Sequence, residues 1–218
     1  AVYLNDPQEG MLLDAALSDE SISGIDGLRL LYSTHWKQKR ADENAAREPS
    51  KAYVLSFTGS QEESLPMWAH YGDGGDGCLI GFDLTSRRTP AYGVMYEKTE
   101  WISALRELNQ ALAQVETDEA VLDYAQSVVR QLSFLCKDKC FAYENEARLI
   151  LMCEPDAHMV HEEVREGEVF PRIYAESPVP TPIKSVVLGP KVTAPEQIAM
   201  VLYHRGIKSV SCSNIQLR

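Results

Sequence analysis

Strand-like and helical segments follow one another along this chain without strict alternation. Short runs rich in β-branched and aromatic residues predict about seven strands, among them the buried runs 53–58 (YVLSFT) and 147–153 (ARLILMC). Amphipathic patterns predict helices at 100–115, 118–136 and 195–205. We therefore expect an α+β fold, with a mixed, largely antiparallel sheet and flanking helices, rather than a doubly wound fold. The other strands are expected at 78–84, 92–96, 169–174, 183–188 and 207–212.

Composition indicates an ordinary globular protein. The chain has 218 residues, 44% hydrophobic and 24% charged, and shows no repeat or long linker, so we expect one α+β domain over residues 1–218. It begins without methionine, on AVYLNDP, which looks like the last residues of a strand. We therefore expect an N-terminal strand to be missing.

Net charge and cysteine content indicate which binding partners and which cellular compartment suit this chain. The formal net charge of −11 repels phosphate backbones, which disfavours nucleic acid but leaves room for a local nucleotide pocket. There is no run of 18 apolar residues and no signal peptide, so we expect no membrane association. Five cysteines without a CxxC pair predict reduced thiols and a cytoplasmic location. The spacing of Cys136 and Cys140 predicts one buried side of a helix.

Several common site motifs are missing from the sequence. It has no GxGxxG after a predicted strand, no GxxxxGK[ST] and no GxSxG; the GDGGDG run at 72–77 follows a predicted helix and is typical of a tight turn. The close pair His158 and His161 lies in an acidic stretch that we expect to be a solvated helix end rather than a metal site. We therefore expect no metal.

The segment FAYENEARLI, residues 141–150, is the strongest local pattern. In an extended chain Glu144 and Glu146 project to one side, and Arg148 continues the alternation and can pair with Glu146. One interpretation is a carboxylate that stabilises a developing cation, such as an oxocarbenium-like carbon. The other is a Glu–Arg bridge that closes a strand end.

Two further groups of side chains suit a ligand. Ser56 and Thr58 end a buried strand and can hydrogen-bond a ligand at the sheet edge, or cap local structure. Ser64 is expected to cap a short helix in which Trp68 and Tyr71 share a face, with His70 beside them. That aromatic pair forms either core or a ligand platform.

These motifs together resemble a bacterial family known as domain of unknown function 2971. Six pieces occur in the family's order over about residues 3–191. They are LNDPQE (4–9), LSFT (55–58), MWAHY (67–71), GCLIGFD (77–83), YENEARLI (143–150) and IKSVVLGPK (183–191). The family carries a further strand before the first piece, which agrees with the missing segment. Because the family is largely uncharacterised, the resemblance implies no chemistry.

A looser resemblance is to ADP-ribosyltransferases, which use a first-strand Arg or His, a second-strand Ser or Tyr, and a late Glu. It implies that Glu146, or else Glu144, stabilises the oxocarbenium formed when nicotinamide leaves NAD. It also implies that Ser56 positions the cofactor. Trp68, His70, Tyr71, Thr58 and Arg148 are the expected cofactor-binding residues. No first-strand Arg or His is identifiable, and SFT differs from the usual STS.

Two functions follow as hypotheses. One is an NAD-dependent ADP-ribosyltransferase-like enzyme acting as a toxin, effector or defence protein, in the bacterial cytoplasm or in a host cytosol. Its expected partners are a small-molecule nucleotide and a protein acceptor or immunity protein. The alternative is a non-catalytic ligand-sensing or protein-interaction domain, in which the same motifs are internal supports.

Overall fold

The computed structural model describes residues 11–36, 51–59, 62–84, 90–116, 118–153, 160–163, 172–175 and 182–215. Its contacts divide the chain into two compact units, which we describe separately. Unit 1 comprises residues 1–58 and 91–176, and unit 2 comprises 59–90 and 177–218. The expectation of a single domain stays a prediction.

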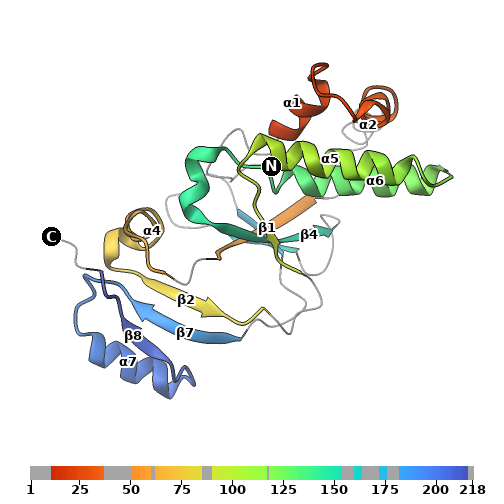
Figure 1. The fold of residues 1–218 in the computed structure, drawn as a ribbon. Helices are drawn as coiled ribbons and strands as arrows, with labels where there is room; N and C mark the ends of the chain where they lie inside the picture. The colour runs from red at the N-terminus through yellow and green to blue at the C-terminus, as the bar shows by residue number, and fades with distance from the viewer. Residues whose placement is uncertain are drawn as a thin grey trace. The chain divides into compact units, whose positions relative to one another are not determined.

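The core of unit 1 is formed by helices. Figure 1 shows α5 and α6 between the sheet and the pair α1 and α2. Leu17, Leu28 and Leu105 are completely buried among these helices. A capping box between Glu97 and Glu100 begins α5, and the Asp118 side chain accepts the Val121 N–H at the start of α6. The bounds are α1 Leu12–Ser18, α2 Asp26–Leu31 with a π-helical turn Tyr32–Trp36, α5 Lys98–Leu112 and α6 Glu119–Ser133.

The sheet of unit 1 has β4 (Glu146–Cys153) at its centre. β1 (Lys51–Thr58) pairs along the whole length of β4, and β3 (Tyr92–Gly93) pairs on its other side, both antiparallel. In this register Ser56 lies opposite Arg148, and Thr58 lies opposite Glu146. Because opposed residues share a face, these four side chains belong to one side of the sheet. A separate hairpin joins β5 (Val160–Glu163) to β6 (Arg172–Ala175).

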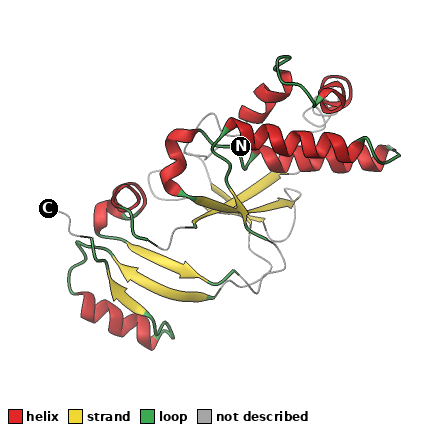
Figure 2. Cartoon of the chain, in the orientation of Figure 1, coloured by secondary structure: helices red, strands yellow, loops and turns green. Residues whose placement is uncertain are grey.

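Unit 2 is a three-stranded sheet with two helices (Figure 2). β7 is central, antiparallel to β2 and parallel to β8, and α7 makes the crossover from β7 to β8. Gly189 follows β7 and its N–H donates to the Gly77 carbonyl, while the Lys191 N–H donates to Gly75. The turn after β7 is thus tied to the GDGGDG run. The bounds are α4 Leu65–Tyr71, a 3₁₀ turn Asp73–Gly75, β2 Cys78–Phe82, β7 Ile183–Leu188, α7 Pro195–His204 and β8 Val210–Cys212.

The predicted α+β class is confirmed, with strands and helices near their expected positions. The strands form separate sheets rather than one. His161 lies in β5 and not at a helix end, because residues 160–163 pair with β6; His158 lies outside the described residues. Ser64 precedes α4 without a side-chain cap. The expected strand at residues 1–4 also lies outside the described residues.

The prediction for the two cysteines is wrong in one respect. α6 ends at Ser133, so Cys136 and Cys140 do not share a helix face. Cys136 pairs with Met95 in an isolated bridge and is fully buried, whereas Cys140 lies in a 3₁₀ helix and is exposed. The bridge fixes the chain just before the segment that forms the candidate site.

Candidate functional site

The candidate site is formed where the chain leaves α6 and enters β4. A 3₁₀ helix, Lys139–Glu144, occupies most of this connection, and the Asp138 side chain caps it by accepting the Cys140 N–H. Asn145 then adopts a left-handed conformation, with φ of 43°, and turns the chain into β4 at Glu146. Asparagine tolerates this conformation better than most residues. Glu144 therefore does not belong to the extended run that begins at Glu146, although both carboxylates contact Lys137.

Four buried side chains nevertheless meet here, and we call them the charged cluster: Lys137, Glu144, Glu146 and Arg148. The Lys137 Nζ atom lies 2.6 Å from Glu144 Oε2 and 3.2 Å from Glu146 Oε2. Arg148 donates from Nε to Glu146 Oε1 at 3.0 Å and from Nη2 to Glu146 Oε2 at 2.8 Å. Exposure is 2% for Lys137, 3% for Glu144, 9% for Glu146 and 2% for Arg148. The predicted Glu146–Arg148 pair is thus present, and it is buried.

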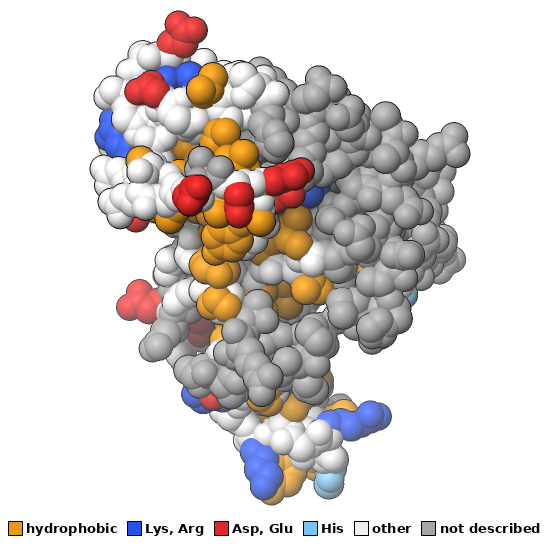
Figure 3. Space-filling model, turned by 90° about the vertical axis from the view of Figure 1, so that its right-hand side faces the viewer, with side chains coloured by type: hydrophobic (Ala, Val, Ile, Leu, Met, Phe, Trp, Pro, Cys, Tyr) orange, Lys and Arg blue, Asp and Glu red, His pale blue; other side chains and the backbone are white. Residues whose placement is uncertain are grey.

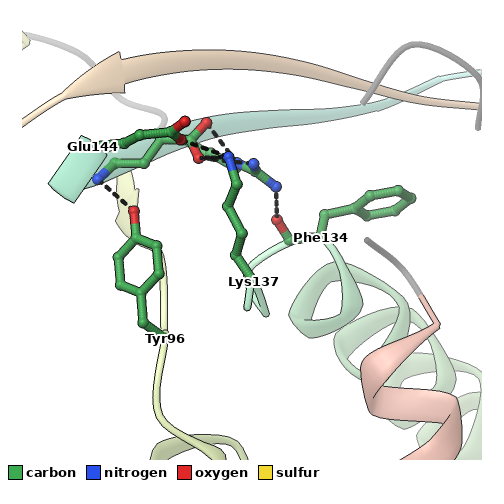
Figure 4. Close-up of polar contacts among 6 residues, drawn as sticks. Tyr96, Phe134, Lys137 and Glu144 are labelled. Atoms are coloured by element: carbon green, nitrogen blue, oxygen red, sulfur yellow. Dashed lines mark hydrogen bonds and ion pairs between the residues drawn. The ribbon is translucent and has the colours of Figure 1, made fainter. Parts of the chain in front are cut away.

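Neighbouring groups hold the cluster to the end of α6 and to the segment between β3 and α5 (Figure 4). Arg148 Nη1 donates to the Phe134 carbonyl at 2.6 Å, directly after α6. The Tyr96 hydroxyl accepts the backbone N–H of Glu146 at 2.9 Å. Lys137 Nζ also lies 4.8 Å from the centre of the Phe141 ring, within reach of a cation–π interaction. The cluster therefore links α6, the 3₁₀ helix and the start of β4.

The electrostatics keep Glu146 ionised. Burial alone raises its pKa, but hydrogen bonds from Arg148 and Ser56, together with the charges of Arg148 and Lys137, outweigh burial, so the pKa is lowered. Burial raises the pKa of the Tyr96 phenol, which stays neutral. With two cations facing two carboxylates, the formal charges of the cluster cancel.

The structure brings together those predicted site residues that lie in unit 1. Ser56, an exposed residue, hydrogen-bonds the Glu146 carboxylate, and Thr58 lies opposite Glu146 across the strand pair. Their part in catalysis or cofactor binding stays a prediction.

The aromatic residues proposed for the site belong to unit 2. Trp68 is buried, and its indole N–H donates to Glu63 at 3.0 Å. The same carboxylate accepts from the Ser213 hydroxyl and from the Asn214 N–H, so Trp68 takes part in an internal anchor of the C-terminal segment. His70 and Tyr71 are exposed on α4, in edge-to-face geometry. Trp68 and Tyr71 therefore have different surroundings although they are three positions apart.

Sequence analysis missed Lys137 and Tyr96. Lys137 lies in FLCKDKCF, beside two other charged residues, and this pattern is typical of a solvated helix end. The buried Cys136 before it is the signal that could have placed it inside. Tyr96 has no local signal, because it meets Glu146 from 50 positions away.

The residues that the structure describes contain neither a candidate metal cluster nor a candidate membrane span. No group of His, Cys, Asp and Glu side chains among them has an arrangement that could hold a metal ion. No helix in this part of the chain has the length and apolar character needed to cross a membrane.

The chain was compared with protein families, curated proteins and solved structures. No curated protein and no solved structure matches it significantly. The MWAHY and GCLIGFD pieces and most of YENEARLI lie within a match to a family described as Protein of unknown function (DUF2971), while the other three pieces lie outside it. The looser resemblance to ADP-ribosyltransferases stays a prediction. Residues 67–149 thus confirm the resemblance to the DUF2971 family.

Proposed function

We propose that this chain is a non-catalytic ligand-sensing or protein-interaction domain, in which the charged cluster is an internal support. The observation that carries this proposal is the saturation of Glu146. Its carboxylate accepts two hydrogen bonds from Arg148, one from Lys137 and one from Ser56. A carboxylate has about four lone-pair positions, so groups of the chain itself occupy all of them.

The charge balance supports the same conclusion. A glutamate that stabilises an oxocarbenium-like carbon must present net negative potential to it. Lys137 and Arg148 lie against Glu146 at hydrogen-bond distance and neutralise that potential. A cation developing near this buried group gains little from it.

An NAD turnover assay tests the proposal. Full-length protein is incubated with NAD, and released nicotinamide is measured against a heat-inactivated sample. We expect no release above that background, and we expect Glu146→Gln to lower the melting temperature. Nicotinamide release by the wild type that is lost in Glu146→Gln, with unchanged melting temperature, contradicts the proposal.

A second candidate is the NAD-dependent ADP-ribosyltransferase-like enzyme, acting as a toxin, effector or defence protein. The observation in its favour is the hydrogen bond between Ser56 and an ionised Glu146, the two residue types that this chemistry requires. In this mechanism Glu146 stabilises the oxocarbenium as nicotinamide leaves, and Ser56 positions NAD. This candidate predicts that the wild type releases nicotinamide and that Ser56→Ala and Glu146→Gln each release less than the wild type. If the wild type releases none, the candidate is refuted.

The proposed setting is the same for both candidates. Cys78, Cys136, Cys140 and Cys212 are free thiols. Free thiols fit a reducing compartment, which supports a cytoplasmic setting.

A further inference from the structure

Helix α7 in unit 2 exposes apolar side chains that the sheet leaves uncovered. Ile198 is 37% exposed, Met200 60%, Val201 59% and Tyr203 59%. No residue of α7 is fully buried, although the helix is predominantly apolar. A solvated helix normally carries polar residues on its outer side. Exposed apolar side chains that lie together indicate an interaction site.

Basic side chains lie at one end of this helix. Because α7 makes the crossover between two parallel strands, its last residues are at the same edge as the first residues of β7 and β8. His204 and Arg205 end the helix, Lys184 is the second residue of β7, and Lys208 precedes β8; all four are exposed. Figure 3 shows Lys, Arg and His side chains around hydrophobic ones at its lower end, where Figure 1 has α7.

The local charge is opposite to that of the chain. Residues 177–218 contain five Lys or Arg and a single acidic residue, Glu196, whereas the whole chain has 21 basic and 32 acidic residues. Glu196 is in the first turn of α7, at the end opposite to the basic side chains. No acidic residue of this segment lies at the basic edge. The register of β2 against β7 pairs Phe82 with Ile183 and so brings Asp83 to this edge, where Lys184, Arg205 and Lys208 outnumber it.

We propose that this surface binds an acidic protein segment that carries apolar side chains. We define the α7 surface as Ile198, Met200, Val201, Tyr203, His204, Arg205, Lys184 and Lys208. The charge of the basic edge complements an acidic segment and selects it over a neutral one. The exposed apolar side chains supply area for an amphipathic partner, which a bare polyanion would not use. This inference rests on the proposed interaction function and assigns its surface.

The test uses full-length protein and a labelled amphipathic helical peptide of Glu and Leu, followed by fluorescence anisotropy. We expect saturable binding that weakens with salt, and at least about tenfold weaker binding of the matching Gln and Leu peptide. The pairs Met200→Ser with Tyr203→Ser, and Arg205→Glu with Lys208→Glu, should each weaken binding about tenfold. The controls, Tyr124→Ser and Lys139→Glu, lie in unit 1 and should leave binding unchanged.

Three results overturn this inference. The first is equal binding of the acidic and neutral peptides. The second is binding that the α7 variants do not alter although circular dichroism shows them folded. The third is tighter, α7-dependent binding of anionic lipid vesicles, of single-stranded DNA or of a second copy of the chain. Nicotinamide release by the wild type refutes the proposed function separately, so the two failures are distinguishable.

Discussion

Arg148 is one of the most buried charged residues in the part of the chain that the structure describes. Its guanidinium is 2% exposed, pairs with Glu146 and donates to the Phe134 carbonyl. Replacing it by Met leaves the Glu146 carboxylate buried with fewer cations. We expect Arg148→Met to lower the free energy of unfolding by about 3–5 kcal/mol, as measured by urea denaturation. The control Arg106→Met, at an exposed position, should lower the free energy of unfolding by less than about 1 kcal/mol. Equal losses contradict the role given to Arg148.

Glu146 also determines how stability depends on pH. Its pKa is lower in the folded state than in the unfolded chain. The stability that Glu146 contributes is therefore fully present above its pKa in the unfolded chain. It is lost as the pH falls through its pKa in the folded protein. We expect the free energy of unfolding of the wild type to decrease from about pH 5 downward, and that of Glu146→Gln to decrease less steeply. Parallel curves for the two proteins contradict this assignment.

Cys136 differs from the exposed cysteines in its chemistry. Burial raises the pKa of its thiol to about 12, so the thiolate is scarce at neutral pH. We expect a thiol reagent at pH 8 to modify Cys78, Cys140 and Cys212 before Cys136, as followed by mass spectrometry of peptides. Urea should remove the difference. Early modification of Cys136 in the folded protein would contradict the buried position that we assign to its thiol.

At the scale of elements, local sequence patterns were enough to predict the long helices and strands. The continuous run of β-branched, aromatic and aliphatic residues that predicts β1 and the amphipathic patterns that predict α5 and α6 arise from neighbours in sequence. The path around Asn145 could not be predicted in this way, because a 3₁₀ helix and a single left-handed residue, rather than an extended chain, bring Glu144 next to Glu146. The site was predictable in its Glu146–Arg148 pair, whereas Lys137 reaches the two carboxylates only after the chain turns between α6 and β4.

Gly189 joins β7 to the GDGGDG turn through a close backbone approach. A Cβ atom at this position would overlap the Gly75 carbonyl oxygen and lie 2.8 Å from that of Gly77. Because both obstacles are backbone atoms, we expect Gly189→Ala to destabilise the protein by about 1–3 kcal/mol in urea denaturation. Gly93 is the matched control, since a Cβ there meets nothing within 4 Å. Gly93→Ala should change stability by less than about 0.5 kcal/mol.

At the scale of the whole molecule, the two units differ in burial and charge. Trp68, Val186 and Leu188 are the buried hydrophobic residues among the described part of unit 2, whereas unit 1 has a larger helical core. The net charge of −11 therefore describes the chain poorly, because residues 177–218 are basic. Total composition disfavoured polyanionic partners, but it could not show that basic and apolar side chains meet on α7.

The stability of Glu146→Gln tests most directly whether the charged cluster is a support or a reaction centre. The substitution keeps the shape of the side chain and removes the charge that faces Lys137 and Arg148. We predict a loss of about 3–5 kcal/mol in the free energy of unfolding at pH 7. A value within about 0.5 kcal/mol of the wild type would show that the fold does not depend on this carboxylate and would contradict our account.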